Sequence, residues 1–235
     1  MASEKDKLPS KAGSQDVSDF LEKLARTPAV RSADGRGRLM FAMDATASRE
    51  PSWDQACHIQ GEMFQSTDAL GGLEVQLVFF RGFGECKSSP WVSSSEALVR
   101  RMTAVRCLGG RTQIGKVLKH AMKETEKRKV NALVYVGDCM EENVDELCDI
   151  AGQLGVLGVP MFVFQEGNEP AAMQAFRQFA RLTNGAYCHF DASSAGQLKE
   201  LLAAVAVYAA GGLRALEDYG RNAGSAVARI TSQVK

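Results

Sequence analysis

The sequence predicts an α/β protein with a Rossmann-like, doubly wound sheet that is mostly parallel, has helices on both faces and ends in one short antiparallel edge strand. Short apolar runs alternate along the chain with longer segments of helical periodicity, which is typical of βαβ units. The runs are mostly continuous, as in strands covered on both faces. The 235 residues include 45% hydrophobic and 24% charged side chains, a composition typical of a globular protein.

The first 35 residues are expected to lie outside the main domain. Residues 1–15 alternate charge with Ser, Gly and Pro, and they contain too few apolar side chains to offset the chain entropy lost on folding. We interpret them as a disordered arm. Residues 16–35 contain a short helix between Ser18 and Pro28 and then a Gly-containing linker. The domain itself is predicted to span residues 36–210.

Within this domain, strands are predicted at four apolar runs of four to six residues, and helices are predicted between and after them. The strands lie at residues 39–43, 75–80, 132–136 and 161–164. The helices lie near residues 52–69, 95–105, 113–128, 143–155, 170–182 and 195–210. The third helix carries one apolar stripe at helical spacing, formed by Ile114, Val117, Leu118, Ala121 and Met122.

Two segments depart from this alternation. The stretch RGFGECKSSPW has two Gly residues around Phe83 and short extended flanks, which predicts a hairpin or a small antiparallel edge strand. Residues 211–235 begin with a Gly-Gly break. They are predicted to form either a final helix packed on the domain or a tail that docks on a partner.

Charge and hydropathy argue against several classes of partner. The 28 Lys and Arg residues balance 28 Asp and Glu residues, whereas proteins that bind nucleic acids or anionic membranes usually have a basic excess. A local basic excess over residues 97–129 weakens this exclusion for nucleic acid, which is still not the expected partner. The longest apolar stretch, residues 201–213, is shorter than the roughly 20 residues that a membrane span needs. Because the first residues contain no secretory signal, we expect a cytoplasmic protein.

The cysteines fit the same expectation. None of the six forms a CxxC pair, and four of them lie beside or within apolar runs. The six are Cys57, Cys86, Cys107, Cys139, Cys148 and Cys188. This pattern favours reduced thiols over a disulfide framework or a zinc site.

Oxygen-bearing side chains follow two of the predicted strands and open one helix. Asp44, Thr46 and Ser48 follow the first strand, Asp138 follows the third, and Thr112 ends a Gly-rich turn. Each alone has an ordinary explanation as a cap or turn residue. Because ligands bind at the carboxyl ends of parallel strands, we expect these side chains to converge. Two carboxylates and three hydroxyls suit Mg²⁺ or Mn²⁺ and leave a position for a carboxylate from a partner protein.

These residues also carry a family resemblance. DATAS, GGRT and VYVGD resemble the three motifs of the von Willebrand factor A (VWA) domain, which form its metal-ion-dependent adhesion site (MIDAS). The family pattern is DxSxS, then a distant Thr in a Gly-rich turn, then a distant Asp after a hydrophobic strand. The five residues named above match it in order and spacing, and the resemblance covers about residues 36–210.

The sequence departs from the family pattern at two positions. Thr46 replaces the first Ser, which keeps the hydroxyl. Cys139 stands where the family often has Gly, and this substitution puts the geometry of that loop in question.

The resemblance implies metal-dependent protein recognition rather than catalysis, so we expect no enzyme. It also implies a bacterial cytoplasmic setting in which such domains work beside AAA+ ATPases or in stress-resistance systems. Positions next to the motifs predict a rim that contacts the partner: Arg49, Glu50, Phe83, Arg111 and Glu141. Among these, Arg111 is expected to pair with an incoming carboxylate and Phe83 to supply an apolar contact.

Two alternatives remain. In the first, GGRTQIGK is the phosphate loop of an ATPase, because its spacing fits GxxxxGK and the strand before Asp138 resembles a Walker B motif. Against it, Val117 stands where Ser or Thr would hold Mg²⁺, and the preceding segment has the pattern of a helix end. In the second, the chain is a VWA fold whose site binds no metal.

Overall fold

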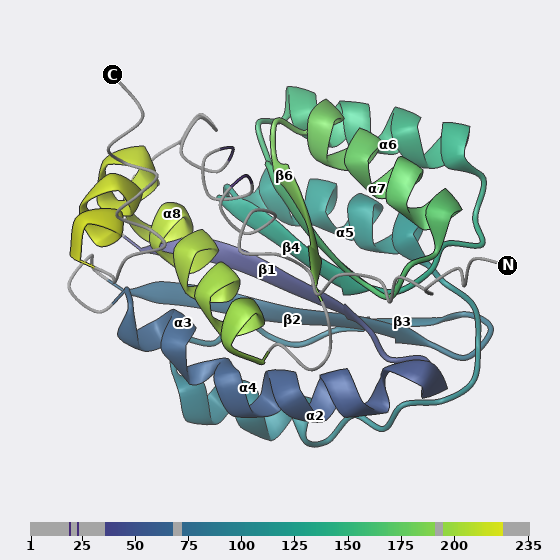
Figure 1. The fold of residues 1–235 in the computed structure, drawn as a ribbon, viewed down its shortest axis with the longest axis horizontal. Helices are drawn as coiled ribbons and strands as arrows, with labels where there is room; N and C mark the ends of the chain where they lie inside the picture. The colour runs from purple at the N-terminus through teal and green to yellow at the C-terminus, as the bar shows by residue number, and fades with distance from the viewer. Residues whose placement is uncertain (1–18, 20–22, 24–35, 68–71, 191–194, 223–235) are drawn as a thin grey trace, which may run out of the picture.

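The computed structural model describes residues 36–67, 72–190 and 195–222, together with Asp19 and Lys23 (Figure 1). The arm predicted at residues 1–15 lies outside the described residues, as does nearly all of the helix and linker predicted at 16–35. No helix in the described ranges is both long enough and apolar enough to span a membrane.

Six strands form one sheet in the order β3-β2-β1-β4-β5-β6. They are β1 (Gly37–Asp44), β2 (Leu73–Arg81), β3 (Glu85–Ser88), β4 (Ala132–Gly137), β5 (Met161–Glu166) and β6 (Ala186–Phe190). All neighbouring strands are parallel except β2 and β3, which pair antiparallel at the edge. The predicted fold class is therefore confirmed, including the hairpin around Phe83, and β6 extends the sheet beyond the four predicted apolar strands and the predicted edge strand.

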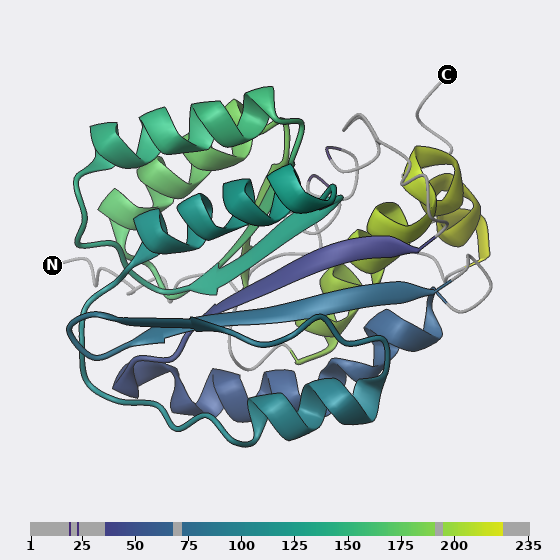
Figure 2. The same ribbon diagram turned by 180° about the vertical axis from the view of Figure 1, so that it is seen from behind.

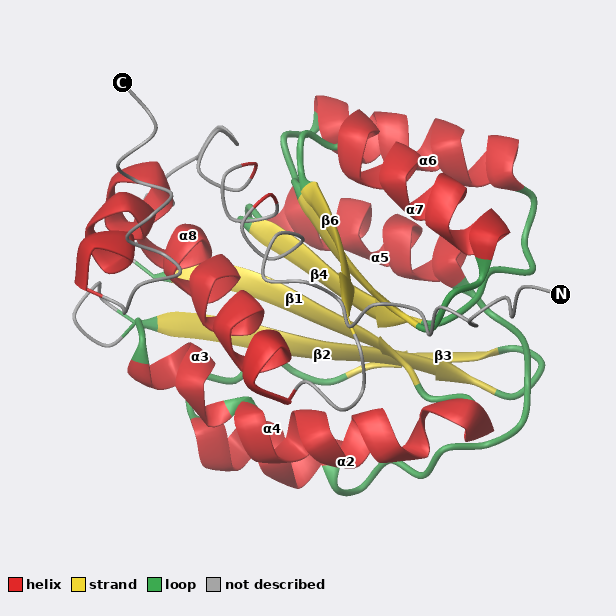
Figure 3. Ribbon diagram, in the orientation of Figure 1, coloured by secondary structure: helices red, strands yellow, loops and turns green. Residues whose placement is uncertain are grey.

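Helices cover both faces of this sheet (Figures 2 and 3). One face carries α2 (Glu50–Ile59), α3 (Gly61–Gln65), α4 (Ser95–Met102) and α8 (Ala195–Asn222), and the other carries α5 (Ile114–Lys127), α6 (Val144–Val156) and α7 (Pro170–Leu182). In β1, Leu39 and Phe41 face the first layer whereas Met40 and Ala42 face the second. Both sides of the strand are buried, which explains its uninterrupted apolar sequence.

Two helices differ from the prediction. The helix expected near residues 52–69 is two helices, because α2 ends at Ile59 and α3 begins at Gly61. Gln60 caps the end of α2, and its side-chain amide donates to Ser95 Oγ at 3.1 Å. The helix expected at 195–210 continues to Asn222. Gly212 interrupts it with φ 74° and ψ −165°, so the predicted Gly-Gly break is a kink inside α8.

The order of the strands determines where a ligand would bind. From β1 the chain moves outward to β2 and β3 on one side, then returns to β4 and continues outward on the other side. In open α/β sheets, ligands bind outside the carboxyl ends of the strands at the point where the strand order reverses. Here that point lies between the ends of β1 and β4, which are neighbours in the sheet.

Candidate metal site

Asp44 is the last residue of β1 and is fully buried. Its Oδ1 accepts a hydrogen bond from the backbone N–H of Thr46 at 2.7 Å, which turns the chain sharply at the strand end. The next backbone N–H, that of Ala45, donates to the carbonyl of Phe80 on β2 at 3.0 Å and anchors the turn to the sheet. Asp44 Oδ2 is buried and has no hydrogen-bond partner. One carboxylate oxygen is therefore held in place while the other is left without a partner.

The loop after β1 reaches the end of β4 through Ser48. Its hydroxyl donates to Asp138 Oδ2 at 2.9 Å and lies 3.4 Å from the hydroxyl of Thr46. Asp138 directly follows β4, and its Oδ1 is likewise buried without a hydrogen-bond partner. The structure thus links Thr46, Ser48 and Asp138 by side-chain contacts and brings the Asp138 carboxylate close to that of Asp44.

Thr112 joins this group through the loop that follows Asp138. The Thr112 backbone N–H donates to the Glu141 carboxylate at 2.9 Å, and the Glu141 backbone N–H donates to the Thr112 hydroxyl at 3.0 Å. The neighbouring Glu142 carboxylate accepts from the backbone N–H groups of Ile114 and Gly115 at the start of α5. Two acids therefore fix the start of α5 against the end of β4, where helix N–H groups favour negative charge.

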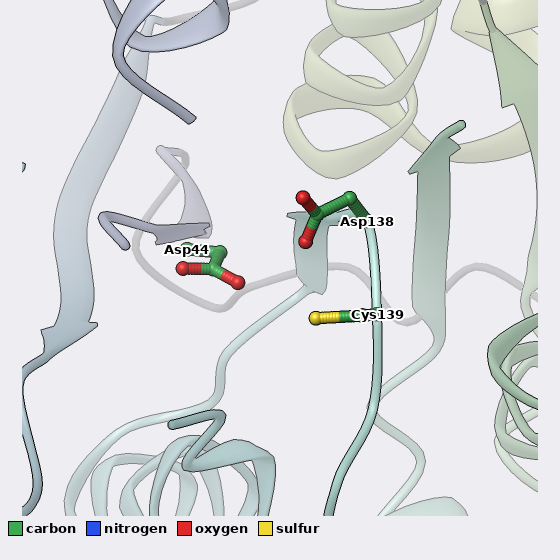
Figure 4. Close-up of side chains that lie close together, drawn as sticks. All are labelled: Asp44, Asp138 and Cys139. Atoms are coloured by element: carbon green, nitrogen blue, oxygen red, sulfur yellow. The ribbon is translucent and has the colours of Figure 1, made fainter. Parts of the chain in front are cut away.

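Cys139 is a member of the site that the sequence reasoning did not assign as a ligand. One ligand atom from each of Asp44, Asp138 and Cys139 lies within 4.8 Å of the others. Figure 4 shows the two carboxylates and the thiol turned toward a common space between the ends of β1 and β4. The signal in the sequence is the position of Cys139 directly after Asp138, where the chain departs from the family pattern.

The electrostatics of the site disfavour extra negative charge when no cation is bound. Burial raises the pKa of Asp44 to about 6, an effect that the nearby Asp138 reinforces and the hydrogen bonds from Thr46 oppose. Burial, together with Asp138, raises the pKa of the Cys139 thiol to about 12. The Tyr135 hydroxyl is buried without a hydrogen-bond partner, and its pKa is raised well above the ordinary value by burial and by Asp44. A bound cation would compensate this accumulation of acids.

Four of the five predicted rim residues are exposed: Glu50, Phe83, Arg111 and Glu141. Arg49 is not, because only 1% of its surface is accessible. It ends the short 3-10 helix η1 (Ala47–Arg49), and its guanidinium forms an ion pair with Glu166, which also accepts a hydrogen bond from Ser52. The prediction of a rim role for Arg49 is therefore corrected. Its side chain turns inward because Glu166, at the end of β5, supplies a charge partner there.

The geometry argues against the phosphate-loop alternative. The GGRTQIGK segment follows helix α4, not a strand. The backbone N–H groups of Thr112 and Gly115, which would have to face phosphate oxygens, donate to the carboxylates of Glu141 and Glu142 at 2.9 Å each. The Lys116 ammonium is already engaged, since it donates to the Gly84 carbonyl at 2.7 Å and to the Gln113 side chain at 2.8 Å. Carboxylates at these positions would repel a nucleotide.

Comparison with known proteins rests on structure, because no protein-family model and no curated protein sequence matches the chain. A von Willebrand factor type A protein from Catenulispora acidiphila superposes with a TM-score of 0.59 at 16% identity, over 72% of this chain and 42% of that one. The SpRpn10 VWA domain superposes with a TM-score of 0.55 at 13% identity, over 75% of this chain and 97% of that one.

The chain has a VWA fold. Proximal thread matrix protein 1 from the mussel byssus, in a structure with a zinc-occupied MIDAS motif, is also similar, with a TM-score of 0.56 at 13% identity over 72% of this chain and 45% of that one. The described VWA fold carries Asp44 at the end of β1, Thr46 and Ser48 just after it, Thr112 before α5 and Asp138 after β4. The sequence resemblance and the structural likeness therefore agree on the fold.

Proposed function

We propose that this chain is a metal-ion-dependent protein-binding module, in which a divalent cation at the carboxyl ends of β1 and β4 captures an acidic side chain of a partner. The observation that carries the proposal is the pair of buried carboxylate oxygens without hydrogen-bond partners, Asp44 Oδ2 and Asp138 Oδ1. Buried charged groups are normally paired or bound to a metal. A cation bound between the two carboxylates would be coordinated by these oxygens and would offset the repulsion between their negative charges.

The chemistry of the remaining donors supports a site with an open position. Hydroxyl oxygens are offered by Thr46, Ser48 and Thr112. Together with the two carboxylates they form an all-oxygen set of ligands, which by itself would favour Mg²⁺ or Mn²⁺. Ser48 is exposed whereas Asp44 is buried, so the site has one side toward the protein and one toward solvent. A partner carboxylate can approach from the solvent side and complete the coordination.

The surroundings support recognition more than catalysis. Phe83 is 86% exposed at the tip of the β2–β3 turn, and the carbonyl of Gly82 in this turn accepts a hydrogen bond from the Arg111 backbone N–H at 3.0 Å. An exposed aromatic ring, a cationic side chain and a metal-bearing edge together suit an acidic, partly apolar protein surface. We infer that the module has no enzymatic activity of its own.

Affinity capture tests this function. Immobilised protein is expected to retain an acidic partner in the presence of divalent cation and to release it in EDTA, because the metal bridges the two surfaces. Divalent cations should stabilise the Phe83→Ser variant against thermal unfolding as they do the wild-type protein. The variant should nevertheless bind the captured partner at least several-fold more weakly, since it loses an apolar contact beside the metal. Val156→Ser is the matched control, because Val156 is 90% exposed at the end of α6. Capture that is unchanged by EDTA would refute the proposal.

A further inference from the structure

Within the described residues, the site holds the one group of three or more His, Cys, Asp or Glu side chains whose ligand atoms lie within 4.8 Å of one another. The group combines the two carboxylates of Asp44 and Asp138 with the thiol of Cys139 (Figure 4). Ligand atoms around one tetrahedral zinc ion lie about 3.5 Å apart, given bonds of about 2.0–2.3 Å. A small inward movement of three side chains would therefore bring them to coordination distance.

The thiol is not an isolated feature of this edge. Asp44 is fully buried and has an oxygen without a hydrogen-bond partner, and the Oδ1 of Asp138 is likewise buried without one. Both carboxylates are turned toward the same space as the thiol (Figure 4). Cys139 is half-buried and free of any disulfide. The carboxylates thus supply an independent requirement for a cation at the position that the sulfur faces.

A sulfur ligand changes which cation is preferred. Mg²⁺ and Ca²⁺ take oxygen ligands almost exclusively, whereas thiolates favour zinc and other thiophilic ions. Building on the proposed function, we propose that Cys139 is a thiolate ligand of this metal site and makes it selective for Zn²⁺ over Mg²⁺. Binding displaces the thiol proton to solvent and forms a metal–sulfur bond, with no change of oxidation state.

This assignment also determines how a partner binds. Asp44, Asp138 and Cys139 supply three protein ligands, which leaves one position of a tetrahedral zinc ion for water or an outside oxygen. The hydroxyl groups of Thr46, Ser48 and Thr112 would then surround the metal ligands without binding the zinc ion themselves. Ser48 already does so, because it donates a hydrogen bond to Asp138 at 2.9 Å. A partner carboxylate would displace the bound water at this open position.

Co²⁺ is a spectroscopic substitute for Zn²⁺ and tests the assignment directly. The wild-type protein titrated with Co²⁺ should develop a near-ultraviolet sulfur-to-cobalt charge-transfer band, and Cys139→Ser should lose it. Cys148→Ser is the matched control, because Cys148 is a half-buried thiol on α6 that donates to Gln178 at 3.3 Å, and it should keep the band. The preference for Zn²⁺ over Mg²⁺ should fall about tenfold or more in Cys139→Ser, the scale at which even outer-shell changes act.

The possible outcomes separate this inference from the proposed function. Co²⁺ that binds and stabilises the wild-type protein without a charge-transfer band would overturn the role of Cys139 and leave the metal-dependent module intact. Absence of binding by Co²⁺, Zn²⁺, Mg²⁺ and Mn²⁺ would overturn both. X-ray absorption of the wild-type zinc complex gives a check that needs no variant, because it should show sulfur at about 2.3 Å from zinc; a shell of oxygen and nitrogen alone would contradict the assignment.

Discussion

Replacing Asp44 with Asn is expected to raise the free energy of unfolding of the metal-free protein at neutral pH while abolishing its stabilisation by divalent cations. The buried carboxyl has a pKa of about 6 in the folded protein, against an ordinary value of 3.8. Between these values the folded state binds more protons than the unfolded state, so stability falls as the pH rises from about 4 to about 6. The loss amounts to about 3 kcal/mol at neutral pH, which Asn avoids because it does not ionise.

Asn is the suitable replacement because its Oδ1 can still accept the hydrogen bond from Thr46. Urea unfolding in EDTA between pH 4.5 and 8 should show a decline for the wild-type protein that is absent in Asp44→Asn. With metal at 100 times its dissociation constant, the wild-type protein should gain about 2.7 kcal/mol and the variant nothing. A variant that is less stable than the wild-type protein in EDTA at neutral pH would contradict this account of the buried charge.

The Gly110→Ala variant is expected to be strongly destabilised, whereas Gly109→Ala should be nearly neutral. A Cβ on Gly110 would lie 2.2–2.4 Å from backbone atoms of Gly82 in the β2–β3 turn, but a Cβ on Gly109 would meet nothing within 4 Å. Backbone cannot move aside as a flexible side chain can. We expect a loss of about 1–3 kcal/mol for Gly110→Ala and a change within about 0.5 kcal/mol for Gly109→Ala, measured by urea unfolding.

This pair of variants also probes the metal site, because Gly110 lies two residues before Thr112. Displacement of the turn should move Thr112 away from Glu141 and weaken metal binding in Gly110→Ala, while Gly109→Ala binds as the wild-type protein does. Equal unfolding free energies for the two variants would show that the close approach of the two loops does not constrain the fold.

The sequence predicted the strands well because each is buried on both faces and therefore continuously apolar. It also predicted the convergence of Asp44 and Asp138, since they stand at the carboxyl ends of β1 and β4, which are neighbours in the sheet. The inward turn of Arg49 could not be predicted, because its partner Glu166 lies 117 residues away along the chain. The sequence did not predict the proximity of the Cys139 thiol to the two carboxylates for a similar reason, since the direction in which the thiol points depends on the path of the chain after β4.

The phosphate-loop alternative shows the same limit of local sequence patterns. GxxxxGK spacing is a local pattern, and it matched in GGRTQIGK although the fold places Glu141 and Glu142 against the N–H groups that a phosphate would need. Spacing in the sequence does not reveal that a distant acidic loop occupies these groups.

Calorimetric titration of the purified protein with divalent cations at neutral pH tests the central claim most directly. We predict one bound ion per chain, with binding lost in Asp44→Asn and in Asp138→Asn. Binding should be retained in Glu50→Gln, which removes an exposed acid from the first position of α2. Absence of binding at millimolar cation, or equal binding by the wild-type protein and Asp44→Asn, would contradict the claim that this edge of the sheet is a metal site.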